Sequence, residues 1–79
     1  MKIKYGNFET TNLRELREHV NNKQVVVTIE ELLNEDLPIN QNLQIFDNDD
    51  TILFDKTIIN INITKQYLTK TTSIIFQYN

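Results

Sequence analysis

The sequence predicts a single small α+β domain of two layers, a mainly antiparallel sheet of four to six strands with one main helix packed on it. Three observations predict this class. The chain has 79 residues, which is the size of one small domain (residues 1–79). Short segments rich in β-branched and aromatic residues alternate with turns rich in Asn and Asp. One segment near the N-terminus repeats its leucines with helical spacing.

Two strands are predicted in the first third of the chain. In residues 1–8, Ile3 and Tyr5 alternate with lysines, which is typical of a strand with one buried face. Gly6, the only glycine, indicates a bulge or bend near the end of this strand. Residues 25–27 are three consecutive valines, and this run predicts a buried strand.

The main helix is predicted over about residues 12–21. Asn12 suits the N-cap position, and Glu15 three residues later completes a pair that resembles a capping box. The apolar residues then follow at i, i+3 and i+7, which places them on one face of a helix: Leu13, Leu16 and Val20.

A second, short helix is predicted over about residues 29–35. Thr28 followed by Glu31 repeats the capping-box spacing. A strand continuing as far as Leu33 is the alternative. Residues 65–70 are equally open, because they fit either a loop or a single helical turn.

The second half of the chain predicts three or more strands. Residues 43–46 and 52–54 flank the turn-forming residues 47–50, which favours a β-hairpin. Residues 57–64 alternate isoleucine with polar residues and predict a further strand. Residues 73–78 predict the last strand.

The charges are strongly segregated along the chain. The first 29 residues carry five basic and three acidic side chains, and residues 56–79 carry three lysines and no acid. Between them lie eight carboxylates with no lysine or arginine: Glu30, Glu31, Glu35, Asp36, Asp47, Asp49, Asp50 and Asp55. Such an asymmetry bears on partners and association rates rather than on fold.

We therefore expect a non-enzymatic protein-binding domain that uses these eight carboxylates to inhibit or regulate a basic partner. An acidic surface held in fixed positions attracts a basic protein and accelerates their encounter. The concrete form we expect is a phage-encoded inhibitor or an immunity-type protein that mimics the charge of nucleic acid. Its partner would be a nuclease, another nucleic-acid-binding protein or a different lysine- and arginine-rich protein.

Two alternatives remain open. In the first, the protein is a homo-oligomeric structural or accessory module, because the neutral Asn60 and Asn62 leave a strand face or edge unguarded; residues 59–63 and the last strand would form the contact of a homodimer. In the second, it binds single-stranded nucleic acid weakly through Lys65, Tyr67 and Lys70. The net charge of −3 argues against direct nucleic-acid binding.

The residue inventory argues against catalysis and cofactors. One histidine, one serine and no cysteine leave almost no nucleophile–base pairs, and a single glycine excludes a glycine-rich phosphate loop. The acidic turn 47–50 resembles a calcium loop only superficially, since Ile52 stands where an EF-hand requires glycine. We expect no catalytic residue, no metal and no cofactor.

The hydropathy pattern argues against a membrane protein. No apolar run approaches the length of a membrane span, and the N-terminus lacks the apolar segment of a signal peptide. We expect a cytoplasmic protein.

Overall fold

The computed structural model covers all 79 residues and consists almost entirely of antiparallel sheet. Strands hold 61% of the residues, and the only helical element is one 3-10 turn, η1 (Val20–Asn22). The seven strands are β1 (Lys2–Tyr5), β2 (Phe8–Thr10), β3 (Leu13–His19), β4 (Gln24–Ile29), β5 (Asn42–Phe46), β6 (Ile52–Gln66) and β7 (Thr71–Tyr78). The predicted α+β class is therefore wrong, and the fold is all-β.

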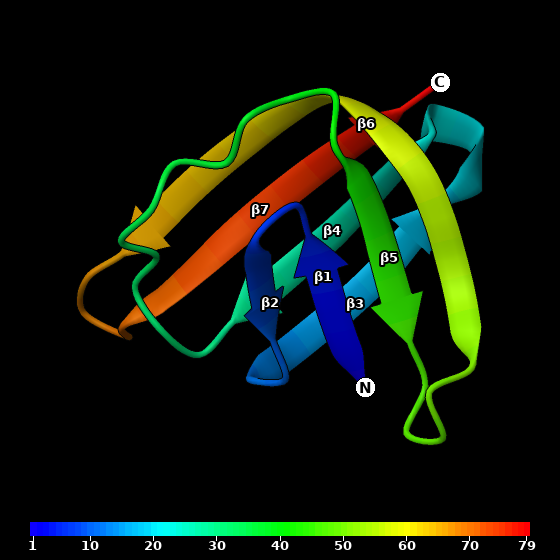
Figure 1. The fold of residues 1–79 in the computed structure, drawn as a ribbon. Coiled ribbons are helices and arrows are strands. Elements are labelled where there is room, and N and C mark those ends of the chain that lie inside the picture. The colour runs from blue at the N-terminus through cyan, green and yellow to red at the C-terminus, as the bar shows by residue number, and fades with distance from the viewer.

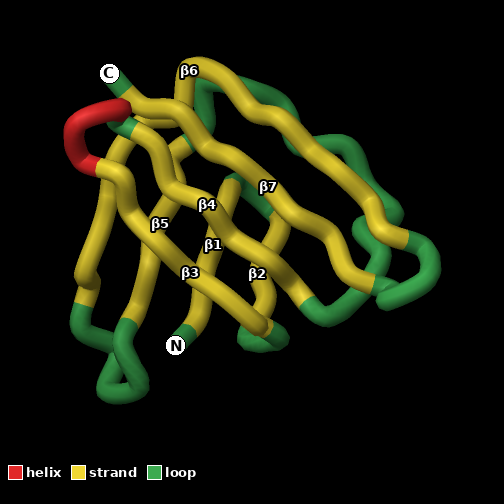
Figure 2. The backbone as a smooth tube through the Cα atoms, turned by 180° about the vertical axis from the view of Figure 1, so that it is seen from behind, coloured by secondary structure: helices red, strands yellow, loops and turns green.

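One continuous sheet folds over to make both layers. Its strand order is β2-β1-β5-β6-β7-β4-β3, and every neighbouring pair is antiparallel. The long strand β6 belongs to both layers, because residues 52–57 pair with β5 and residues 58–66 pair with β7. Figure 1 shows β6 curving from the layer of β1, β2 and β5 to the layer of β3, β4 and β7, which faces the viewer in Figure 2.

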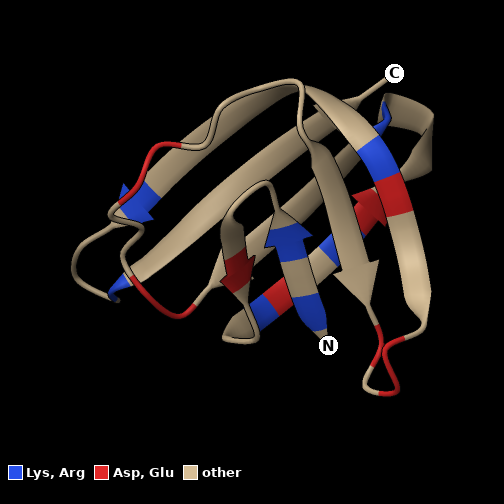
Figure 3. Cartoon of the chain, viewed as in Figure 1, with Lys and Arg blue, Asp and Glu red and all other residues tan.

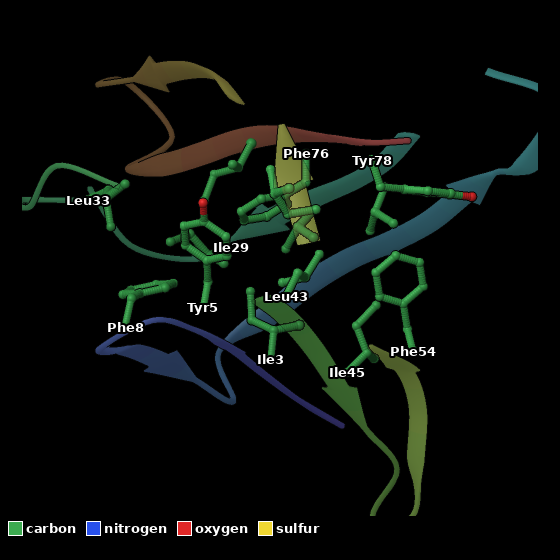
Figure 4. Close-up of a cluster of buried hydrophobic side chains, with 14 residues drawn as sticks. Ile3, Tyr5, Phe8, Ile29, Leu33, Leu43, Ile45, Phe54, Phe76 and Tyr78 are labelled. Atoms are coloured by element: carbon green, nitrogen blue, oxygen red, sulfur yellow. The ribbon is translucent and has the colours of Figure 1, made fainter. Parts of the chain in front are cut away.

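The hydrophobic core lies between these two layers (Figure 4). Alternating residues of β4 and β7 point inward, and the aromatic ring of Phe76 packs against that of Tyr5 with centroids 5.2 Å apart. One cluster contains all fourteen buried hydrophobic residues: Ile3, Tyr5, Phe8, Val25, Val27, Ile29, Leu33, Leu43, Ile45, Phe54, Ile58, Ile74, Phe76 and Tyr78. The layer that covers one half of the sheet is thus the other half of the same sheet and not a helix.

The helix predicted over residues 12–21 is absent, and most of this segment forms β3. A bulge at Arg14 inserts one extra residue, since Leu13 lies opposite Ile29 while Glu15 lies opposite Thr28. The bulge shifts the alternation of the strand by one residue, so both Leu13 and Leu16 pack against the core despite their helical spacing. A helix and a strand with a bulge can both place residues i and i+3 on one face, so the spacing of Leu13 and Leu16 does not distinguish them.

The second helix predicted over residues 29–35 is also absent. Ile29 ends β4, and residues 30–41 form the connection to β5. The two capping residues make tertiary contacts instead: the Thr28 hydroxyl lies 3.2 Å from the Ser73 hydroxyl, and the Glu31 carbonyl accepts a hydrogen bond from Thr72. These bonds to β7 replace the local bonds of a capping box.

The predicted strands are confirmed, with corrections at their ends. The valine run lies in β4, the hairpin joins β5 to β6, and the last strand is β7. The first predicted strand is a hairpin of β1 and β2 that turns at Gly6, whose φ of +58° suits glycine. β6 continues to Gln66, so residues 65–70 contain the end of a strand and a turn.

Candidate functional site

The eight carboxylates of the acidic segment all lie exposed on the surface, but at separate places. We call Glu30, Glu31, Glu35 and Asp36 the loop group, because they lie between β4 and β5. We call Asp47, Asp49 and Asp50 the hairpin group, because they lie in the turn between β5 and β6. Asp55 lies on β6 itself. Figure 3 shows the two groups on opposite sides of the molecule, so they form two acidic surfaces and not one patch.

The hairpin group is held by hydrogen bonds within its own turn. The Asp47 N–H donates to the Thr51 carbonyl at 2.8 Å, and the Asp50 N–H donates to the Asp47 carbonyl at 3.0 Å. Asp50 occupies the left-handed region with a φ of +65°, which Asp tolerates better than most residues. Hydrogen bonding to the Thr51 side chain, and then to its N–H, lowers the pKa of Asp49. These hydrogen bonds therefore hold the three carboxylates in an ordered turn.

The loop group is fixed by contacts with two strands. The Thr72 hydroxyl donates to the Glu31 carbonyl at 2.7 Å and accepts from the Leu33 N–H at 3.0 Å. The Tyr5 hydroxyl donates to the Pro38 carbonyl, and burial raises the pKa of this phenol. Since Leu33 is also buried in the core, the loop has anchors on both layers.

A small cavity opens between this loop and the β1–β2 hairpin. Its volume is about 240 Å³. Glu35 and Asp36 stand beside it, and it is lined by Tyr5, Gly6, Asn7, Phe8, Glu35, Asp36, Leu37, Pro38 and Gln41. Sequence reasoning missed this cavity, because its two walls are about 30 residues apart along the chain and no motif links them.

None of the eight carboxylates forms an ion pair. The two salt bridges of the structure use acids from the N-terminal third, Glu9 with Lys2 and Glu15 with Arg17. None of these carboxylates thus has a cation at ion-pair distance, although the N-terminal ammonium of Met1 donates a hydrogen bond to Asn48 in the hairpin turn.

Asp55 differs from the other seven carboxylates because side-chain amides contact both of its oxygens. The Asn42 amide donates to one oxygen at 3.2 Å, and the Gln44 amide donates to the other at 3.3 Å. These neutral donors orient the carboxylate on the face of the β5–β6 ribbon without cancelling its charge.

The three residues of the nucleic-acid alternative lie at the β6–β7 connection. Lys65 is the second-last residue of β6, while Tyr67 and Lys70 belong to the turn that follows this strand. All three are exposed, and Tyr67 is 70% accessible. They make no salt bridge or cation–π contact in the structure.

No cluster of three or more histidine and carboxylate side chains is arranged to hold a metal ion. No helix has the length and apolar character needed to cross a membrane. Comparisons of the chain with protein-family models, with curated proteins and with solved structures gave no match.

Proposed function

We propose that this chain is a non-enzymatic protein-binding domain whose two acidic groups inhibit or regulate a basic partner in the cytoplasm. The observation that carries this proposal is the contrast in ion pairing. All eight carboxylates between residues 30 and 55 are exposed and lack a cation within 4 Å, whereas Glu9 and Glu15 are paired. Carboxylates without a basic partner within the chain remain available for a basic partner outside it.

The geometry supports a contact at two points. The loop group is anchored through Thr72 and Tyr5, and the hairpin group through its own turn, so neither group has to be ordered on binding. Rigid charges lose less conformational entropy on association than mobile ones do. A partner that engages both groups would present two basic patches, as a nucleic-acid-binding surface does. A phage-encoded inhibitor or an immunity-type protein is the concrete form of this proposal.

The test compares three neutralised variants in capture experiments from a lysate of the native host. The loop variant is E30Q/E31Q/E35Q/D36N, and the hairpin variant is D47N/D49N/D50N. The matched control is E9Q/E15Q/E18Q, which also removes three negative charges but only from acids that already have partners in the chain. We expect a basic protein to be captured at low salt by the wild type and the control, and to be lost from one or both acidic variants.

Salt and affinity measurements decide the outcome. The affinity of the purified partner should fall steeply as salt increases, because screening weakens interactions between exposed charges. If the captured protein binds all three variants with equal affinity, the acidic groups do not form the binding surface. Capture of no basic protein at any salt concentration would contradict the proposal as a whole.

Self-association remains the alternative function, and one of its two predicted contact segments has a free edge. The last strand, β7, lies between β6 and β4 and has no free edge to offer. The remaining part of that prediction, residues 59–63, lies on an edge that has no strand neighbour.

A further inference from the structure

The second half of β6 has one edge without a neighbouring strand. Residues 60–66 pair with β7 on one side, while on the other side β5 begins only opposite Thr57. The connection that precedes β5 runs beside this part of β6 (Figure 1) but exchanges backbone hydrogen bonds with only one of its residues. The Asn40 N–H donates to the Ile58 carbonyl at 2.7 Å, and the Ile58 N–H donates to the Gln41 carbonyl at 2.9 Å. Beyond Ile58 no hydrogen bond reaches this edge.

The strand register identifies the backbone groups on this open edge. The Tyr78 N–H donates to the Lys23 carbonyl, so Tyr78 directs its backbone toward β4 and away from β6. In an antiparallel ladder this direction alternates, so every second residue of β7 also faces β4. Their partners on β6 direct N–H and C=O away from β7, and these partners are Ile61, Ile63 and Lys65. Their six polar backbone groups are available to another strand.

This edge lacks the protection that the other free edges have. β2 is only three residues long and carries Glu9, and β3 carries four charged residues before His19. The strands without any charged residue, β4, β5 and β7, all lie between two neighbours. Residues 59–64 are the exception, because they are uncharged and have no strand neighbour on one side. Natural proteins normally guard such an edge with charge, proline or a cover.

Apolar side chains accompany the open backbone groups. Ile59 is 44% accessible and Ile63 is 38% accessible, although both lie in a strand of the main sheet. Ile59 is the extra residue of a bulge, since Ile58 lies opposite Tyr78 and Asn60 opposite Gln77. A strand added to this edge would cover part of this apolar surface and satisfy the backbone groups.

We propose that this edge pairs antiparallel with the same edge of a second copy of the chain, forming a dimer about a twofold axis. The resulting sheet would run without interruption from β7 through β6 into the β6 and β7 of the second copy. This inference makes the self-association alternative specific, and it does not rest on the binding of a basic partner.

The sequence of β6 favours its own copy as the occupant. In a symmetric antiparallel pair, residues of the same parity stand opposite one another. Over residues 60–64 the alternation therefore sets isoleucines opposite isoleucines and the polar residues Asn60, Asn62 and Thr64 opposite one another. Each chain carries a net charge of −3, so two copies repel as a whole, and residues 59–64 add no charge to this repulsion.

The experiment measures the dissociation constant of the intact chain by sedimentation equilibrium over a dilution series. Asn62→Lys places a positive charge on the exposed face of β6, where the twofold axis brings the two lysines close together. Ile63→Pro removes an outward N–H and leaves the bonds to β7 in place. The matched control is Asn21→Lys, which makes the same charge change in the exposed turn η1.

We expect a dimer whose dissociation constant rises by about tenfold or more in Asn62→Lys and Ile63→Pro and is unchanged in Asn21→Lys. The wild-type dimer should persist at high salt, since its contact is uncharged; this separates it from the acidic binding proposed above. A chain that remains monomeric up to about 1 mM would overturn the inference. A dimer with the same constant in wild type and Asn62→Lys would overturn it as well, even if the proline variant fails to fold.

Discussion

Replacing Thr72 by valine tests how the acidic loop is anchored. The Thr72 side chain is fully buried, and its hydroxyl joins two backbone groups, the Glu31 carbonyl and the Leu33 N–H. Valine has nearly the same shape but offers neither a donor nor an acceptor. Both backbone groups would then lose their hydrogen-bond partner. Because Leu33 is buried, water has little access to its N–H.

The magnitude follows from these two groups. An unsatisfied buried backbone group costs about 1–3 kcal/mol, and Glu31 is exposed enough for its carbonyl to recover part of this from water. We therefore expect Thr72→Val to lower the free energy of unfolding by about 2–4 kcal/mol. For a domain of this size the Tm would fall by at least about 8 °C.

Urea denaturation measures the change in free energy, and hydrogen exchange at the Leu33 amide reports on the anchor itself. The matched control is Ser73→Ala, which removes the neighbouring hydroxyl and its single contact with Thr28 on the partly exposed outer face. This control should lower stability by less than about 1 kcal/mol. If Thr72→Val is no more destabilising than Ser73→Ala, and the Leu33 amide exchanges as slowly as before, the loop is not held by Thr72.

Three further predictions concern the turn, the core and the acidic tip. Gly6→Ala should destabilise the chain by about 1 kcal/mol in thermal unfolding, because the φ of +58° at this position strains a residue with a side chain even though no atom lies closer than 3.6 Å to the added Cβ; an unchanged Tm would contradict this. Phe76→Ala should cost about 3–5 kcal/mol in urea denaturation, because the ring is fully buried against Tyr5, and a loss below about 1 kcal/mol would show that the two layers are not packed around it. The pKa of Asp49 is lowered in the folded chain, so its contribution to stability is present above the unfolded value of 3.8 and is lost as the pH falls through the lower folded value. NMR titration should place the Asp49 midpoint below 3.8, and the value should return toward 3.8 in Thr51→Val; a midpoint at or above 3.8 in the wild type would refute the assignment.

The strands that could be predicted are those whose signal is local. The valines of β4 and the two arms of the β5–β6 hairpin combine high β-propensity with clear turn residues, and the structure confirms both. The helix over residues 12–21 could not be rejected, because a bulged strand with Leu13 and Leu16 on one face has the same spacing as a helix. Only the pairing of β3 with β4 distinguishes the two.

Some features of the candidate site could likewise be predicted from the sequence, and others depend on the fold. The exposure of the eight carboxylates follows from their charge, and the sequence alone predicts it. Their separation into a loop group and a hairpin group depends on β5, which carries the chain from the loop to the hairpin turn (Figure 3). The pairing of Glu9 with Lys2 likewise joins two strands of the folded sheet.

The sequence by itself determined the charge segregation, the uncharged alternation of residues 57–64 and the hairpin turn at residues 47–50, because each depends only on neighbouring residues. The tertiary structure decided that the sheet folds onto itself, that Thr28 and Glu31 bond to β7 instead of capping a helix, and that one half of β6 has an open edge. The physical reason is that a strand obtains its hydrogen bonds and its buried face from segments that are distant along the chain. A strand is therefore an edge or an interior strand only in relation to the neighbours that the fold supplies.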